Sequence, residues 1–87
     1  MNTARPTRVG EVWTRSEGNQ TAVFDPATGR LSLLNPSALA IWELCDGETD
    51  RDEIVDALSE LTGRTRAEVA EEVEATLLKL RQLDLLT

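Results

Sequence analysis

The chain has 87 residues, enough for one small domain with a modest core. Its 16 acidic and 9 basic side chains give a net charge of −7, and such a surface repels phosphate backbones and anionic lipid, so neither nucleic acid nor a membrane is an expected partner. The single cysteine, Cys45, excludes an internal disulfide and fits the reducing cytoplasm. Residues 1–7 lack the apolar run of a signal peptide. We expect them to form a mobile tail, followed by a single domain over residues 8–87.

Three strands are expected in the N-terminal part of the chain. Residues 9–15 and 20–24 are rich in strand formers and flank a turn cluster that contains a glycine, which predicts a β-hairpin. Residues 25–29 place Asp, Pro and Gly as in a type I turn closed by a left-handed residue. A third, apolar strand is therefore expected over Arg30–Leu34.

A first helix is expected directly after the third strand. Asn35 is a favoured N-cap residue, and Pro36 has a backbone angle already suited to the first helical turn. Four apolar residues at helical spacing predict its buried face: Ala38, Ile41, Trp42 and Cys45. Gly47 is expected to end this ten-residue helix in a left-handed conformation.

A second helix is expected to begin at Thr49 or Asp50. Thr49 with Asp52, or Asp50 with Glu53, supplies a side-chain cap, and Gly63 ends the helix. Its apolar stripe is expected to consist of Ile54, Leu58 and Leu61, with Val55 and Ala57 beside it.

A third helix is expected after the capping box formed by Thr65 and Glu68. Its inner face is expected to comprise Val69, Ala70, Val73, Leu77 and Leu80. The periodicity breaks near Asp84, so Leu85 and Leu86 are expected to fold back onto the core. The resulting order β-β-β-α-α-α predicts an α+β fold, in which a three-stranded antiparallel sheet is followed by three helices in a winged helix-turn-helix-like arrangement.

Catalytic groups are scarce in this sequence. The absence of histidine removes the commonest general base and metal ligand and excludes a Ser–His or Cys–His nucleophile. Neither GxxxxGK[ST] nor GxGxxG occurs. Cys45 lies on an apolar stripe beside Asp46 at a helix C-terminus, where a thiol pKa is raised, so we interpret it as a packed residue. We expect no enzyme, no metal and no cofactor.

The third strand is an unprotected edge in the predicted order 1-2-3. Residues 31–34 are apolar apart from one serine and carry no charge or proline that would guard the edge. The strand is covered within the monomer, pairs with itself in a dimer, or accepts an extended peptide as a fourth strand beside the third helix. The alternative function is a small acidic winged-helix protein that binds DNA or a transcription partner. Glutamates among the arginines of the third helix argue against DNA.

The sequence resembles a known family at this point. GRLSLLNPSALAIWELCDG over residues 29–47, then EIVDALSEL, then an amphipathic helix that ends in LRQLDLL, resemble the PqqD family, whose domains are also called RiPP recognition elements. The N-x-x-A start of the first helix and the LCDG that follows it carry much of the likeness. The resemblance covers about residues 9–86 and implies a winged-helix-like domain without DNA binding.

The resemblance also implies a function. The leader of a ribosomally made precursor peptide is expected to bind as an added strand against the third strand, in the cleft toward the third helix. The domain is expected to deliver that precursor to a modifying enzyme, such as a radical SAM protein, a cyclase or a leader peptidase. The segment DPATGRLSLLN over residues 25–35 also resembles the stand-alone recognition proteins of lasso-peptide systems. We expect a cytoplasmic monomer or weak homodimer. The expected contact residues are Arg30, Leu31, Ser32, Leu33, Leu34, Val69, Glu72, Val73 and Thr76.

Overall fold

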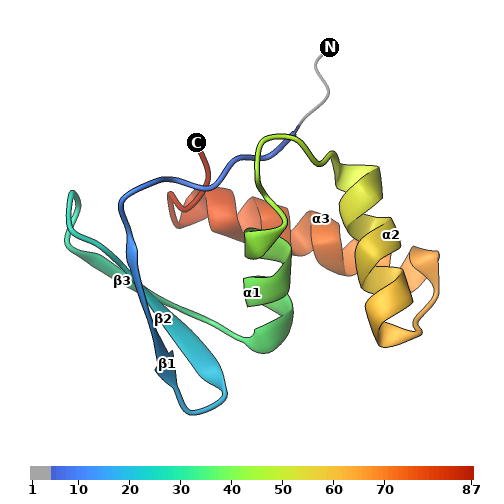
Figure 1. Cartoon of the computed structure of the whole chain (residues 1–87), viewed down its shortest axis with the longest axis horizontal. Helices are drawn as coiled ribbons and strands as arrows, with labels where there is room; N and C mark the ends of the chain where they lie inside the picture. Colours follow the sequence, from blue (N-terminus) through green and yellow to red (C-terminus); the bar gives the residue numbers. More distant parts are fainter. Residues whose placement is uncertain (1–4) are drawn as a thin grey trace.

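The computed structural model describes residues 5–87, which form three strands followed by three helices. The strands are β1 (Trp13–Glu17), β2 (Gln20–Asp25) and β3 (Arg30–Leu34), and the helices are α1 (Pro36–Glu43), α2 (Arg51–Thr62) and α3 (Arg66–Gln82). The sheet is antiparallel with order β1-β2-β3. Figure 1 shows the sheet on one side of α1 and α2 on the other, with α3 running from α2 toward the sheet. The predicted α+β fold is confirmed.

The first strand begins and ends later than the sequence pattern predicted. Gly18 takes a φ of 66° in a two-residue loop, so that Glu17 pairs directly with Gln20 and β1 extends to Glu17. Before the strand, Glu11 has a φ of 59°, which bends the backbone ahead of Trp13. The expected strand over residues 9–15 is therefore wrong in its bounds, although the hairpin itself is confirmed.

Helix α1 is shorter than the ten residues expected. It ends at Glu43, with Leu44 as its C-cap in a right-handed conformation. Gly47 does take a φ of 82°, but three residues beyond that cap, where its amide donates to the carbonyl of Pro6 at 3.0 Å. A Cβ at this position would lie 2.9 Å from Thr7 Oγ1. Gly47 therefore permits close approach of the N-terminal segment and does not stop the helix.

The caps of α2 and α3 agree with the sequence. Asp50 with Glu53 forms the capping box of α2, which settles the alternative with Thr49, and Thr65 forms its box with Glu68. Leu61 was expected on the apolar stripe of α2, but its side chain is 77% exposed. It lies in the last turn of α2, where no other element of residues 5–87 covers it.

The C-terminal residues fold back onto the core, as predicted. The amide of Asp84 donates to the carbonyl of Arg81, and the amide of Leu85 donates to that of Leu80, which together form a Schellman motif. Asp84 occupies the left-handed position of this motif, with a φ of 60°, where glycine is usual. The turn buries Leu85 and Leu86. Leu85 then accepts a hydrogen bond from the Trp42 indole at 3.0 Å and ties α1 to the end of α3.

The N-terminal segment differs in part from the expected tail over residues 1–7. Residues 1–4 lie outside the described part of the chain. Pro6 is buried and accepts from the Gly47 amide, and Thr7 accepts from the Thr87 amide at 2.8 Å. These bonds bring both ends of the described chain together beside α1. In residues 5–87 no helix has the length and apolar character needed to cross a bilayer.

The left-handed Asp84 gives a stability prediction. We expect Asp84→Gly to raise the free energy of unfolding by ~0.5–1 kcal/mol, because glycine takes this conformation without steric cost. Asp84→Ala should lower the free energy of unfolding, since alanine adopts the left-handed conformation less readily than aspartate. Urea unfolding followed by circular dichroism measures both variants. A glycine variant less stable than the wild type would contradict this interpretation of the turn.

Candidate functional site

The open edge of β3 exposes the backbone groups of two leucines. Glu17 and Gln20 close the first hairpin as a hydrogen-bonded pair, because the other pairing pattern needs a bond between the adjacent residues 18 and 19. Backbone groups alternate along a strand, so those of Ala22 also point toward β1. Ala22 is the partner of Leu33 in the register, so the N–H and C=O of Leu33, and likewise of Leu31, point away from β2. Within residues 5–87 no backbone hydrogen bond outside the sheet occupies them.

Side chains of β3 alternate between the two faces of the sheet. Ser32 and Leu34 point toward the helices and are buried, with exposures of 6% and 2%. Leu31 and Leu33 point to the opposite, outer face and are 63% and 55% exposed. Arg30 has the same parity as Ser32, and its guanidinium reaches the end of α3. Each exposed leucine thus offers its peptide groups to the edge and its side chain to the outer face.

A small cleft of about 120 Å³ separates the C-terminal end of β3 from α3. From β3 and α1 it is lined by Leu33, Leu34, Asn35 and Ala38, and from α3 by Glu72, Thr76, Lys79 and Leu80. Its volume is close to that of a single medium-sized side chain. The cleft lies beside the backbone groups that β3 leaves unpaired, so an extended chain on this edge would place side chains into it.

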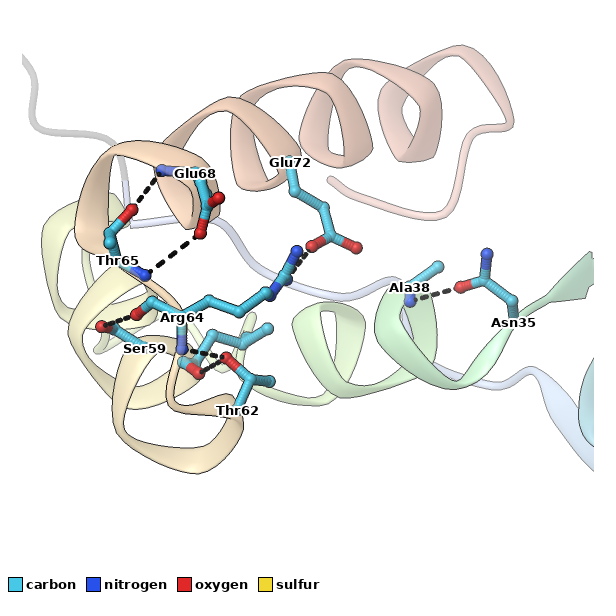
Figure 2. A network of polar contacts seen from close by, with 9 residues as sticks. Asn35, Ala38, Ser59, Thr62, Arg64, Thr65, Glu68 and Glu72 are labelled. Carbon is cyan, nitrogen blue, oxygen red and sulfur yellow. Dashed lines mark hydrogen bonds and ion pairs between the residues drawn. The ribbon is translucent and has the colours of Figure 1, made fainter.

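Charged contacts hold both ends of this region. At the start of β3, Arg30 donates to the Gln82 carbonyl at 3.2 Å and lies 3.8 Å from the Asp84 carboxylate. This places a cation at the negative end of the α3 dipole. At the other end, Glu72 forms an ion pair with Arg64, and Figure 2 shows the two side chains meeting between α3 and the α2–α3 loop. The hydrogen bond from Arg64 to Glu72 raises the pKa of Arg64. Lys79, which lines the cleft, takes part in no ion pair within residues 5–87.

The structure rearranges the contact residues expected on α3. Val69 and Val73 are fully buried in the core and do not line the cleft. Glu72 and Thr76 do line the cleft, and Lys79 and Leu80 join them. The exposed cleft face follows the 72, 76, 79 positions, one step around the helix from the buried 69, 73, 77, 80 stripe. Asn35 and Ala38 of α1 also line the cleft, and sequence reasoning assigned them only structural roles.

An apolar row crosses the outer face of the sheet, beside the Arg15–Glu17 ion pair. Trp13 pairs with Phe24, and Phe24 with Leu31, so three large apolar residues form one row across the strands. The Trp13 and Phe24 rings lie 5.8 Å apart, and Trp13 is 68% exposed. This row and Leu33 border a hollow of about 680 Å³ over Ala22. Sequence reasoning did not predict this row, because its members are far apart in the chain and become neighbours only through strand pairing.

Within the described part of the chain, the remaining thiol and carboxylate groups do not assemble into a site. Cys45 is fully buried, its Sγ donates to the Ile41 carbonyl at 3.2 Å, and burial raises the pKa of its thiol to about 11. The interpretation of Cys45 as a packed residue is confirmed. The Asp46 pKa is lowered by the hydrogen bond from the Glu48 amide, which makes it a loop anchor. Across residues 5–87, no cluster of histidine, cysteine or carboxylate side chains suits a metal ion.

The fold and this edge define a small α+β domain with an open strand beside a helix. A scan against protein families matches residues 20–86 to the family of coenzyme PQQ synthesis protein D (PqqD). The match covers most of the chain, and the chain belongs to the PqqD family, as the resemblance of the sequence indicated.

A solved structure shares this fold. The chain described as "TbiB1 in complex with the TbiA(beta) leader peptide" matches with a TM-score of 0.76 and 22% identity. The match covers 92% of the present chain and 93% of TbiB1. A search of the curated proteins finds no match.

Proline substitutions test the direction of the β3 backbone groups. Leu33→Pro removes an amide that points to the open edge, so we expect the fold to persist. Ser32→Pro removes an amide that faces β2, and the free energy of unfolding should fall by ~2 kcal/mol more than in Leu33→Pro. Urea unfolding of the two variants measures the difference. An equal loss of stability in the two variants, or a larger loss for Leu33→Pro, would contradict the assigned direction of these amides.

The buried thiol gives a pH prediction. Folding raises the Cys45 pKa from 9.0 to about 11, so its stabilising contribution is complete below about pH 9 and is lost as the pH rises toward 11. The free energy of unfolding should fall over this range in the wild type, and this component should be absent in Cys45→Ala. At pH 8 an aromatic disulfide reagent should label the folded protein at least ~100-fold more slowly than the urea-unfolded chain. Rapid labelling in native buffer would contradict the packed thiol.

Proposed function

We propose that this domain binds the leader segment of a ribosomally made precursor peptide as a fourth strand on β3. The observation that carries the proposal is the pair of outward-pointing peptide groups at Leu31 and Leu33, next to the cleft of α3. Main-chain hydrogen bonds to such an edge supply affinity for an extended peptide, and adjoining pockets supply selectivity. Arg30, Ser32 and Leu34 contribute by holding the edge against the core, and Glu72, Thr76 and Lys79 form the opposite side of the cleft.

The comparisons support this proposal. The chain belongs to the PqqD family, and TbiB1, which shares its fold, is described as a complex with a leader peptide. Membership of this family also supports a binding role without catalysis. We propose that the domain acts in the cytoplasm and delivers the bound precursor to a modifying enzyme. This enzyme is a radical SAM protein, a cyclase or a leader peptidase.

The charges of the helices oppose the alternative of DNA binding. Near the start of α3, Arg66 pairs with Asp56 at 2.8 Å and Arg64 pairs with Glu72. These arginines are already neutralised by neighbouring carboxylates, while DNA affinity depends on cations that are free to neutralise phosphates. A peptide, which needs backbone groups more than charge, is the better-matched ligand for this surface.

Strand addition makes a prediction with matched variants. The probes are fluorescein-labelled synthetic peptides that cover the short open reading frames encoded beside this gene. We expect one leader peptide to bind at low micromolar concentration or tighter and Leu33→Pro to weaken it at least ~30-fold, since a backbone donor is lost and a proline ring is placed on the edge. Fluorescence polarisation measures the affinities.

The control places the same change on the other edge of the sheet. Ser16 of β1 has an outward-pointing amide by the same alternation, so Ser16→Pro should leave peptide affinity within about twofold. Circular dichroism confirms that both variants fold. Binding that survives Leu33→Pro, or that falls equally in Ser16→Pro, would contradict addition at β3.

A further inference from the structure

The outer apolar row ends abruptly at the open edge. Trp13, Phe24 and Leu31 lie side by side on β1, β2 and β3, and cross-strand neighbours of this kind stabilise one another. At Leu31 the row stops with that side chain 63% exposed, and Leu33 beside it is 55% exposed. A sheet edge normally lacks such unguarded apolar side chains. A strand added at β3 would place a fourth residue in this row, beside Leu31.

The backbone alternation determines where that member lies. A strand that pairs with Leu31 and Leu33 places the residues opposite them on the outer face, because paired residues point to the same side of a sheet. The residue between these two faces the helices, opposite Ser32. A bound chain therefore contacts both faces of the domain with alternate side chains. This inference rests on the proposed strand addition at β3.

Ser32 adds an independent observation on the inner face. Ser32 is 6% exposed, and its buried Oγ has no hydrogen-bond partner among residues 5–87. A buried hydroxyl without a partner is uncommon and costly. On an added strand, the residue directly opposite Ser32 faces the same side of the sheet. Rotation of the Ser32 side chain about χ1 turns its hydroxyl toward the edge, where a serine or threonine in that residue pairs with it as in Ser–Thr cross-strand pairs.

We infer that the domain selects peptides with a large apolar residue, then serine or threonine, then a second large apolar residue. The two apolar side chains cover Leu31 and Leu33 on the outer face, and the middle hydroxyl bonds Ser32 on the inner face. The ligand is thus an amphipathic extended segment defined by three consecutive residues. Trp13 lies on β1, two strands away from β3, and is not among the residues that the added strand covers.

The test uses a displayed library of random twelve-residue peptides, selected on the immobilised full chain. Binders that are lost on Leu33→Pro are sequenced. We expect enrichment of the apolar–hydroxyl–apolar triplet in these peptides. Leu31→Ser and Leu33→Ser should each weaken a selected peptide about tenfold or more, while the control Trp13→Ser, on the same face, should change affinity less than twofold.

The middle position has its own measurement. Threonine→valine in the selected peptide and Ser32→Ala in the domain should each weaken binding, and the two changes together should weaken it no more than either one, as for partners of one bond. Additive effects would overturn the hydroxyl pairing.

The remaining outcomes separate the two levels of the proposal. Peptides whose binding is lost on Leu33→Pro but that lack the triplet, or that still bind after Leu31→Ser, would overturn this inference and leave strand addition standing. An equal loss in Trp13→Ser would also overturn it, because the ligand would then lie across the whole outer face. Binders that ignore Leu33→Pro, or the absence of binders, would overturn strand addition and this inference together.

Discussion

The two-residue loop at Gly18 determines which backbone groups this domain offers to a ligand. By pairing Glu17 with Gln20, the loop fixes the alternation along β1, and the register carries it through β2 to β3. A shift of one residue would turn the Leu31 and Leu33 amides into the sheet and bury their side chains against the helices. The tight turn between β1 and β2 therefore determines which backbone groups of β3 point to its open edge.

The edge is preformed because contacts at both ends hold it. Arg30 joins the start of β3 to the last turn of α3, and Asn35 caps α1 directly after the end of β3, with its side chain accepting from the Ala38 amide at 2.8 Å. Figure 2 shows this cap and the network around Arg64 and Glu72. A strand already held in place loses little conformational entropy on pairing, so more of its interaction energy appears as affinity.

Local chemistry made much of this fold predictable from sequence. The helix caps at Asn35, Asp50 and Thr65, and the position of β3 after its Pro/Gly turn, follow from residue types within a few positions of one another. The tie at Pro6 did not, because it depends on Gly47 meeting a segment forty residues away. The end of α1 was misplaced because the glycine that serves this contact was interpreted as the residue that stops the helix. The cleft was predicted between the correct elements, but the choice of Val69 and Val73 took the core stripe of α3 for its cleft face. Their exposure depends on the rotation of α3 against α1 and α2, which periodicity alone does not give.

Amide hydrogen exchange at β3, resolved by NMR with and without a bound leader peptide, tests the central claim most directly. In the free protein the Leu31 and Leu33 amides should exchange at nearly the rate of an unstructured chain, and the Ser32 amide should be protected. Binding should slow Leu31 and Leu33 strongly and leave Ser32 as it was. Protection of Leu31 and Leu33 in the free protein, or binding that leaves their exchange fast, would contradict the assignment of this edge as the peptide-binding site.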